Sequence, residues 1–468
     1  MNASNLERRH FYRSLFVLVM PIALQNLINT AVSSADVIML GYVSQTALSA
    51  GSLANQFQFI LNLFFSGMTS GVIMLAAQYW GKGDLVSIEN LLGIGLKISV
   101  TVGFCFSAAA CIFPNFLMLI FTSDPELIEA GASYLRSVGI SYLFMSISQV
   151  YLSVMKSIER VKISTIISSS SLVINIFLNA TFIFGLFGAP KMGIIGVGVA
   201  TTIARIIELL LCVADAFRQN VIRLNPVHVF RKNRLLFQDF IRYSGPALGN
   251  EIVWGVAFSM YSVIMGHLGS DIVAANSVVT VARNLGTILC FGIANGGAIL
   301  LGKEIGNNQM ELAKRDAKSL CWVTFASGLL GTVVILLVKP LILNMADLTD
   351  TAYGYLNIMI YINSVYVIGQ AMNTSLICGI FRAGGDSRYG FICDIIDMWC
   401  FSVPLGFLCA FVFRLPVMVV YVILCLDEFV KMPFIFFHYK SYRWLKNITR
   451  DFSENTEVAS PSNPEITE

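Results

Sequence analysis

The sequence predicts an all-α integral membrane protein whose transmembrane helices, about twelve in number, form two six-helix lobes related by pseudo-symmetry. Of its 468 residues, 56% are hydrophobic and only 13% are charged, whereas a soluble protein of this size carries about 25% charged residues. The mean hydropathy is +0.73. A spanning helix needs about 20 mainly apolar residues, so the chain is long enough for roughly twelve spans joined by short loops.

An internal repeat predicts the two lobes. The first part of the chain aligns with its middle, without a gap, after a shift of 225 positions. The matched pairs are Pro21 with Pro246, Gly41 with Gly266, Ala50 with Ala275, Ser52 with Ser277, Gly67 with Gly292, Gly71 with Gly296 and Gly81 with Gly306. Prolines kink helices and small residues let them pack closely. A duplicated, kinked bundle of this kind is typical of secondary transporters, whose two halves rock about a site between them.

The spans follow one another with short loops. We expect them near residues 14–40, 46–80, 90–113, 127–155, 163–187, 193–217, 243–267, 271–303, 316–338, 351–378, 389–412 and 416–438. The second and eighth are long for a bilayer and should tilt or bend. Within them, Gly67 and Gly71, and likewise Gly292 and Gly296, have the small-xxx-small spacing of close helix contacts.

The expected domains are an N-terminal lobe (1–217), a basic cytoplasmic linker (218–242), a C-terminal lobe (243–440) and a polar cytoplasmic tail (441–468). Lys and Arg gather in alternate loops, and the opposite loops keep only Lys191, Lys339 and Arg414. By the positive-inside rule, both termini of this multi-pass cell-membrane protein are cytoplasmic. The same bias explains the basic linker, so we expect no nucleic-acid partner.

Several ionisable side chains of the C-terminal half fall near the bilayer midplane, where a charge is costly and is a functional candidate. These are Glu251, Arg283, Asp394, Asp397, Asp427, Glu428 and Lys431. Lys431 follows Asp427 and Glu428 by four and three positions, as in a local structural ion pair. For Glu251 and Asp397 two interpretations stand: a structural ion pair with Arg283, or a site that takes up a proton or a cation and couples transport to an ion gradient.

The N-terminal half has a different candidate. Asp36 lies near the outer end of the first span, and Asn175 and Asn179 share one face of the fifth. A carboxylate beside two amides suits a proton or a sodium ion, whereas a helix-end residue that reaches the interface is the alternative for Asp36. We therefore place cation or proton coupling at Asp36, Asn175 and Asn179 together with Glu251, Asp394 and Asp397. Arg205 and Glu208, three apart, form an expected internal ion pair.

A polar, irregular cavity is expected between the lobes. The prolines leave backbone carbonyls without helical hydrogen bonds, and polar side chains lie close to them in sequence, as in an irregular helix that lines a cavity. The candidate cavity residues are Gln25, Asn26, Asn29, Gln149, Asn250, Arg283 and Gln370. The ten cysteines include no Cys-x-x-Cys pair, and none lies near a histidine at zinc-like spacing. With only four histidines, and with no nucleophile triad or phosphate loop, the sequence predicts no enzyme and no bound metal beyond a sodium ion at Asp36 or at Glu251 and Asp397. No repeated filter segment indicates a channel.

Four motifs, in this order, resemble those of the multidrug and toxic compound extrusion (MATE) transporters of bacteria. They are Met-Pro-Ile-Ala-Leu-Gln-Asn from residue 20 with Asp36 downstream, Ala-Gln-Tyr-Trp-Gly-Lys-Gly-Asp at 77–84, Asn175 and Asn179 before Ile-Phe-Gly at 183–185, and Phe-Arg-Ala-Gly-Gly-Asp-Ser at 381–387. The resemblance covers nearly the whole chain outside its polar ends.

This resemblance implies a MATE-like fold and an antiporter that exports organic cations and drugs in exchange for H⁺ or Na⁺. The two lobes would rock around a central cleft, with no cofactor other than the coupling ion. The expected partners are membrane lipids and small cationic substrates, and the protein should act as a monomer. The alternative is a flippase for lipid-linked oligosaccharides of a related fold, which would need a more cationic cavity.

Overall fold

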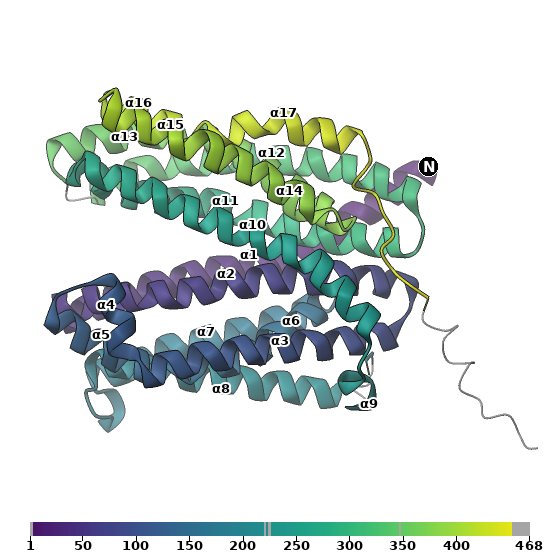
Figure 1. Cartoon of the computed structure of the whole chain (residues 1–468), viewed down its shortest axis with the longest axis horizontal. Coiled ribbons are helices and arrows are strands. Elements are labelled where there is room, and N and C mark those ends of the chain that lie inside the picture. Colours follow the sequence, from purple (N-terminus) through teal and green to yellow (C-terminus); the bar gives the residue numbers. More distant parts are fainter. Residues whose placement is uncertain (1–2, 220, 223–225, 346–347, 452–468) are drawn as a thin grey trace, which may run out of the picture.

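The computed structural model describes residues 3–219, 221–222, 226–345 and 348–451, and this part of the chain is almost entirely helical. Of the polar tail expected at 441–468, residues 452–468 lie outside it. The first lobe runs from α1 to α8 (Figure 1). Its elements are α1 (Ala3–Val43), α2 (Gln45–Lys82), α3 (Leu85–Ile112), α4 (Pro114–Phe121), α5 (Pro125–Gly139), α6 (Ser141–Ser157), α7 (Val161–Phe184), a short 3₁₀ turn η1 (Leu186–Gly188) and α8 (Gly193–Arg218).

The short helix α9 (Pro226–Phe230) follows, and the second lobe runs from α10 to α17. Three of its segments, named η2 to η4, are π-helical. Its elements are α10 (Arg234–Leu268), α11 (Ser270–Gly306), α12 (Met310–Met345), α13 (Asp350–Thr374), η2 (Ser375–Phe381), α14 (Ser387–Asp394), η3 (Ile395–Ser402), α15 (Val403–Phe407), η4 (Leu408–Val412), α16 (Val417–Leu424) and α17 (Asp427–Lys440).

Local chemistry sets several of these boundaries. Ser44, Asp84 and Asn233 precede α2, α3 and α10, and each side chain accepts a hydrogen bond from a backbone N–H of the first turn. Gly83 and Gly185 end α2 and α7 with φ of 80° and 71°, a left-handed conformation that favours glycine. These caps satisfy backbone groups that a helix end leaves free.

Within the described residues, ten helices are long and apolar enough to cross a membrane, and the bent pair α5 and α6 makes eleven. That pair meets at 46° and corresponds to the single fourth span that the sequence predicts. The last expected span is divided into α16 and α17. Because α16 has 8 residues and α17 has 14, each is too short to cross a membrane alone, and the span is therefore not among the ten.

The lobes cross at one end of the molecule. The first half of α1 packs on α11, where Gly292 and Gly296 lie against Val19. In the equivalent place of the repeat, the first half of α10 packs on α2, where Gly67 and Gly71 lie against Leu248 and Ser244. A Cβ at Gly71 would overlap Ser244, so only glycine allows the two backbones to approach this closely.

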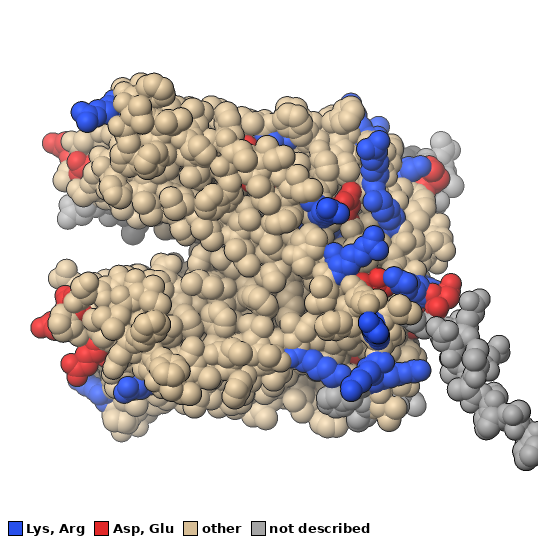
Figure 2. Space-filling model, viewed as in Figure 1, with Lys and Arg blue, Asp and Glu red and all other residues tan. Residues whose placement is uncertain are grey.

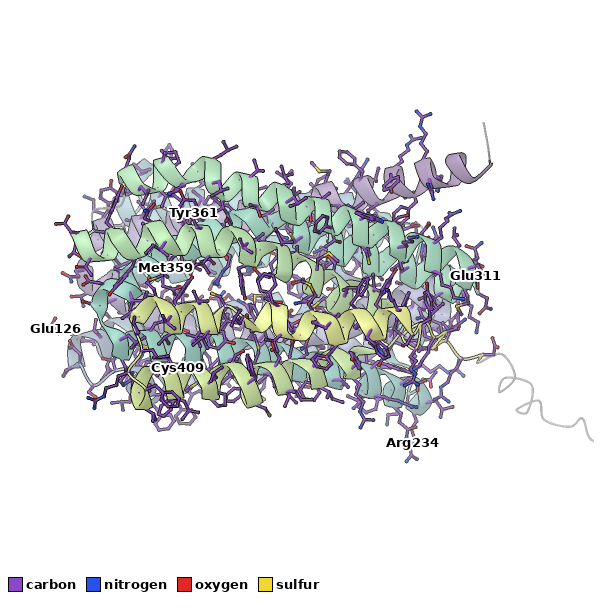
Figure 3. All side chains as sticks on the ribbon, turned by 90° about the horizontal axis from the view of Figure 1, so that it is seen from above. Glu126, Arg234, Glu311, Met359, Tyr361 and Cys409 are labelled. Carbon is purple, nitrogen blue, oxygen red and sulfur yellow. The ribbon has the colours of Figure 1, made fainter. Side chains whose placement is uncertain are left out.

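Lys and Arg side chains gather at the end where the lobes cross, which we call the basic end (Figure 2). At the opposite end, the cleft end, a deep notch separates the two lobes (Figure 2). In Figure 3, Arg234 and Glu311 lie at the basic end and Glu126 lies at the cleft end. The molecule is therefore a V whose arms join at the basic end.

A strap of residues 441–451 leaves α17 and joins the two lobes at the basic end (Figure 1). The buried Gln78 of α2 donates to the carbonyls of Ala383 (2.7 Å) and Lys446 (3.1 Å) and accepts from the N–H of Ile448 (2.8 Å). Trp444, within the strap, is fully buried. The strap thus adds hydrogen bonds between lobes to the close contacts of the crossing helices.

Candidate functional site

The cleft between the lobes encloses about 1500 Å³ and reaches from the cleft end into the middle of the bundle. Side chains from α1, α2 and α5 to α8 line one wall, and side chains from α10, α11, α13 and α16 line the other. Polar and aromatic groups alternate along it, among them Asn29, Gln149, Phe258 and Tyr366. A drug-sized ligand pocket measures roughly 300–1000 Å³, so the cleft has room for such a molecule.

A chain of polar groups lies on the first-lobe wall. Asn179 donates to Oδ1 of Asp36 (2.6 Å) and to Oδ1 of Asn175 (3.3 Å), and Asn175 donates to the hydroxyl of Thr201 (3.2 Å). Asn179 is fully buried, whereas Asp36, Asn175 and Thr201 line the cleft. The fold therefore brings the three residues predicted from the first half of the sequence into one cluster, although Asp36 and Asn179 are 143 positions apart.

A second network fills the interior of the second lobe. Arg382, which directly follows η2 and is 5% exposed, donates to Oε1 of Glu251 (2.9 Å) and to Oδ1 of Asn250 (2.8 Å). Asn250 in turn donates to Asp394. Arg382 also donates to the hydroxyl of Ser70 in α2 (2.7 Å), so the network reaches across to the first lobe.

Lys431 is the second buried cation of this network. Its Nζ lies 3.2 Å from Asp394, 3.3 Å from Glu428 and 3.9 Å from Asp397. The local pair expected from sequence, Lys431 with Glu428, is present, but the same ammonium also reaches two carboxylates from α14 and η3. Removing one partner of a buried ion pair typically lowers the stability of the fold by about 3–5 kcal/mol, so loss of Lys431 or of its partners should be strongly destabilising.

Asp397 differs from the other acids of the network. It is 3% exposed, and neither of its carboxylate oxygens has a hydrogen-bond partner within the part of the chain that the structure describes. A buried polar atom without a partner costs about 1–3 kcal/mol, and a proton or a cation would relieve that cost. Asp397 also lies in the π-helical segment η3, and π-helical turns are frequent at functional sites.

Tyr261 links this network to the cleft. Its ring lines the cleft, and its hydroxyl donates to Oδ2 of Asp427 at 3.3 Å. A small cavity of about 90 Å³ adjoins the network and is lined by Asn250, Glu251, Gln370 and Asp394 among others. Among the described residues, no group of three or more His, Cys, Asp or Glu side chains is arranged to hold a metal ion.

The positions of the remaining candidates differ from one to the next. Asn29, Gln149 and Arg283 line the large cleft, Asn250 and Gln370 line the small cavity, and Gln25 and Asn26 line neither. The ion pair expected between Arg205 and Glu208 is present at 2.6 Å. The alternative pairing of Arg283 with Glu251 or Asp397 is wrong: among the described residues Glu251 pairs with Arg382 at 2.9 Å, and the ammonium group near Asp397, at 3.9 Å, is that of Lys431.

Sequence reasoning missed Arg382 and Asn373 as parts of the network. Arg382 belongs to the Arg-Ala-x-Gly-Asp turn, where the positive-inside rule treats it as a cytoplasmic loop residue. Its side chain is instead buried in the lobe. Asn373 donates to Oε2 of Glu428 at 2.7 Å. A usable signal for Arg382 was the excess of buried acids over cations in this half, since buried carboxylates need a nearby positive partner.

The duplicated helix bundle, the cleft between its halves and the buried ionisable network define the class of membrane transporters built from two repeats. The MatE family model matches residues 21–181 and 246–408, two segments that begin 225 positions apart, the offset of the internal repeat. This chain belongs to the MatE family, the multidrug and toxic compound extrusion transporters.

Individual relatives agree with this assignment. The uncharacterized transporter YisQ of Bacillus subtilis is 22% identical over 439 residues, which cover 92% of this chain and 95% of the relative. The probable multidrug resistance protein NorM of Rhizobium meliloti is 26% identical over 87% of each chain. A solved structure described as the outward-facing conformation of a multidrug resistance MATE family transporter superposes with a TM-score of 0.84 at 16% identity, over 92% of this chain and 95% of the other. The two-lobed fold predicted from sequence is thereby confirmed.

Proposed function

We propose that this protein exports organic cations and other drugs from the cell in exchange for protons or sodium ions. The family membership and the multidrug resistance names of its relatives support export of drugs. The large cleft between two related lobes supports a mechanism in which the lobes rock about a shared site.

The orientation of the protein in the membrane follows from the placement of charge. Lys and Arg concentrate at the basic end, which by the positive-inside rule faces the cytoplasm. The cleft then opens to the outside, and the close helix crossing and the strap shut the cytoplasmic end. The structure corresponds to the state in which a substrate is released and a coupling ion enters.

One observation carries the coupling proposal: Arg382 connects the acidic network of the second lobe to the first lobe. Its guanidinium binds Glu251 and, through its other donor group, Ser70 of α2. A proton or a sodium ion at Glu251 would weaken its attraction for Arg382 and so change the contact between lobes. The network holds more carboxylates than cations, so it has spare negative charge for an incoming cation. Its five carboxylates are Glu251, Asp394, Asp397, Asp427 and Glu428, and its two cations are Arg382 and Lys431.

Tyr261 supports communication with the substrate, because it contacts both the cleft and Asp427. The cluster of Asp36 and Asn179 is a second place for a coupling ion, and there ion and substrate would meet in the same cleft. The two sites predict different mutant behaviour. Loss of Asp36 should weaken substrate binding as well as coupling, whereas loss of Asp397 should affect coupling alone.

The test uses proteoliposomes under an imposed pH gradient or an imposed sodium gradient, with the other gradient collapsed. We expect Asp397→Asn and Glu251→Gln to reduce gradient-driven uptake of a fluorescent organic cation more than tenfold, because neither can be charged and discharged. Glu126→Gln, which neutralises an exposed acid at the cleft end, is the matched control and should keep full activity. Full gradient-driven transport by both network variants would refute the coupling role.

A further inference from the structure

The charges that face the cleft are few and of both signs. Among the described lining residues only Asp36, Arg205 and Arg283 are charged. Arg205 forms an ion pair at 2.6 Å with Glu208, whose side chain is 1% exposed, so its charge is already balanced. Two charges remain for a ligand: a carboxylate from α1 on the first-lobe wall and a guanidinium from α11 on the second-lobe wall.

Arg283 has an unusual environment for an intramembrane cation. No Asp or Glu of the described residues forms an ion pair with it, although the network of the same lobe has an excess of acids. Instead its guanidinium lies over the rings of Phe258 (5.4 Å) and Tyr366 (5.7 Å). Cations at membrane depth normally pair with acids or backbone carbonyls, so Arg283 is held in place by aromatic faces with its N–H donors directed to no acidic partner of the protein.

The chemistry of a guanidinium identifies the missing partner. Arginine stays charged at any physiological pH, and its planar fork matches a carboxylate with two parallel hydrogen bonds. The faces of Phe258 and Tyr366 beside it suit a planar aromatic group that carries such a carboxylate. A purely cationic ligand would meet like-charge repulsion at Arg283, and a purely anionic one would meet it at Asp36.

We propose that the cleft is selective for amphoteric aromatic compounds, which carry both a carboxylate and an amine. Arg283 binds the carboxylate, and the polar wall around Asp36 and Asn179 receives the amine. This inference rests on the proposed export function and narrows its substrate class from organic cations to molecules with an anionic group. It makes Arg283 a specificity-determining residue.

The experiment compares a matched pair of probes in proteoliposomes: norfloxacin, a fluoroquinolone with a carboxylate and a piperazine amine, and its methyl ester, which keeps the ring and the amine but loses the negative charge. We expect wild-type protein to transport the acid with at least tenfold higher kcat/KM than the ester. Arg283→Gln should lower kcat/KM for the acid at least tenfold and raise that for the ester, because the repulsion of the cationic ester is removed, and Arg283→Lys should retain part of the preference.

Arg414→Gln is the matched control, since it removes an exposed arginine outside the cleft and should leave both probes unaffected. Equilibrium binding of both probes to the detergent-solubilised protein provides a readout independent of transport. Equal transport of acid and ester by wild type, or an equal loss of both in Arg283→Gln with thermal stability unchanged, would overturn the proposal. If the acid binds in an Arg283-dependent way but neither probe is transported, the export function fails and the carboxylate site stands. If neither probe binds or is transported, the substrate class is wrong.

Discussion

At the scale of single residues, the pairing of buried charges decides what the second lobe can do. Glu251 is 18% exposed and Arg382 is 6% exposed at the side chain, and the two lie 2.9 Å apart. Neither group is stable alone at this depth, because the desolvation of one charge is offset only by the other. The ion pair also positions the Arg382 guanidinium, which donates a hydrogen bond to Ser70 of the first lobe.

This pairing predicts a non-additive pair of mutations. Arg382→Gln should destabilise the protein by about 3–5 kcal/mol, since it leaves Glu251 as a buried charge without its partner. Adding Glu251→Gln to that variant should restore much of the stability, because no unpaired charge remains, but it should not restore gradient-driven transport. Thermal unfolding in detergent and transport in proteoliposomes measure the two effects. Additive losses of stability would show that the two side chains do not depend on each other.

At the scale of helices, glycine sets how closely the lobes approach at the basic end. A Cβ at Gly306 of α11 would overlap the carbonyl oxygen of Gln78 in α2, and a Cβ at Gly81 would overlap the carbonyl oxygen of Lys303. These are backbone atoms, so they cannot move aside as a side-chain tip can. The repeat places Gly81 and Gly306 at equivalent positions of α2 and α11. Gly81 packs against the backbone of α11, and Gly306 packs against the backbone of α2.

We therefore expect Gly306→Leu to push α2 and α11 apart and to lower the thermal midpoint. Overpacking a core typically lowers the free energy of unfolding by roughly 1–3 kcal/mol, and here the loss should be at least that large. Transport should fall as well, because the basic end could no longer close. Gly266→Leu makes the same chemical change near the end of α10, where nothing lies within 4 Å of an added Cβ, and should have little effect. A Gly306→Leu protein as stable and active as the Gly266 variant would argue against this interface.

At the scale of the whole molecule, the strap and the crossing helices close the basic end together. Lys303 of α11 pairs with Glu159, which follows α6, at 2.7 Å, and Arg450 of the strap bonds Asp239 at 2.7 Å. Hydrogen bonding and charge from Asp239 raise the pKa of Arg450 above its ordinary value, so this bond does not switch within physiological pH. Any motion that opens the basic end must break the contact of Lys303 with Glu159, which joins the two lobes.

Gln78→Ala should release the strap, because it removes three hydrogen bonds and leaves backbone groups of Lys446 and Ile448 without their partner. We expect a lower thermal midpoint and faster proteolysis after residue 446. Lys446→Ala is the control, since its side chain is exposed and its carbonyl remains in place. Unchanged proteolysis in Gln78→Ala would mean that packing of Trp444 holds the strap without Gln78.

The spans and their repeat were predictable because lipid imposes a local rule: a helix that crosses it must be apolar over about 20 residues. The exceptions have physical reasons. The fourth span bends at Ile140, and the last is divided into α16 and α17, each too short to cross a membrane alone. The cluster of Asp36 and Asn179 was also within reach of sequence reasoning. The excess of buried acids indicates that some cation turns inward, but it does not single out Arg382, because a cation beside a loop resembles any other positive-inside residue.

By itself, the sequence determined that this is a duplicated membrane bundle with acids at bilayer depth, since hydropathy, charge placement and internal repetition are properties of the chain read in order. Only the tertiary structure decided which cation serves which acid. Glu251 and Arg382 are 131 positions apart, and their contact follows from how α10 packs against α14 and the turn before it. Within the described residues, the same packing places Arg283 over the rings of Phe258 and Tyr366 and gives it no ion pair with an acid.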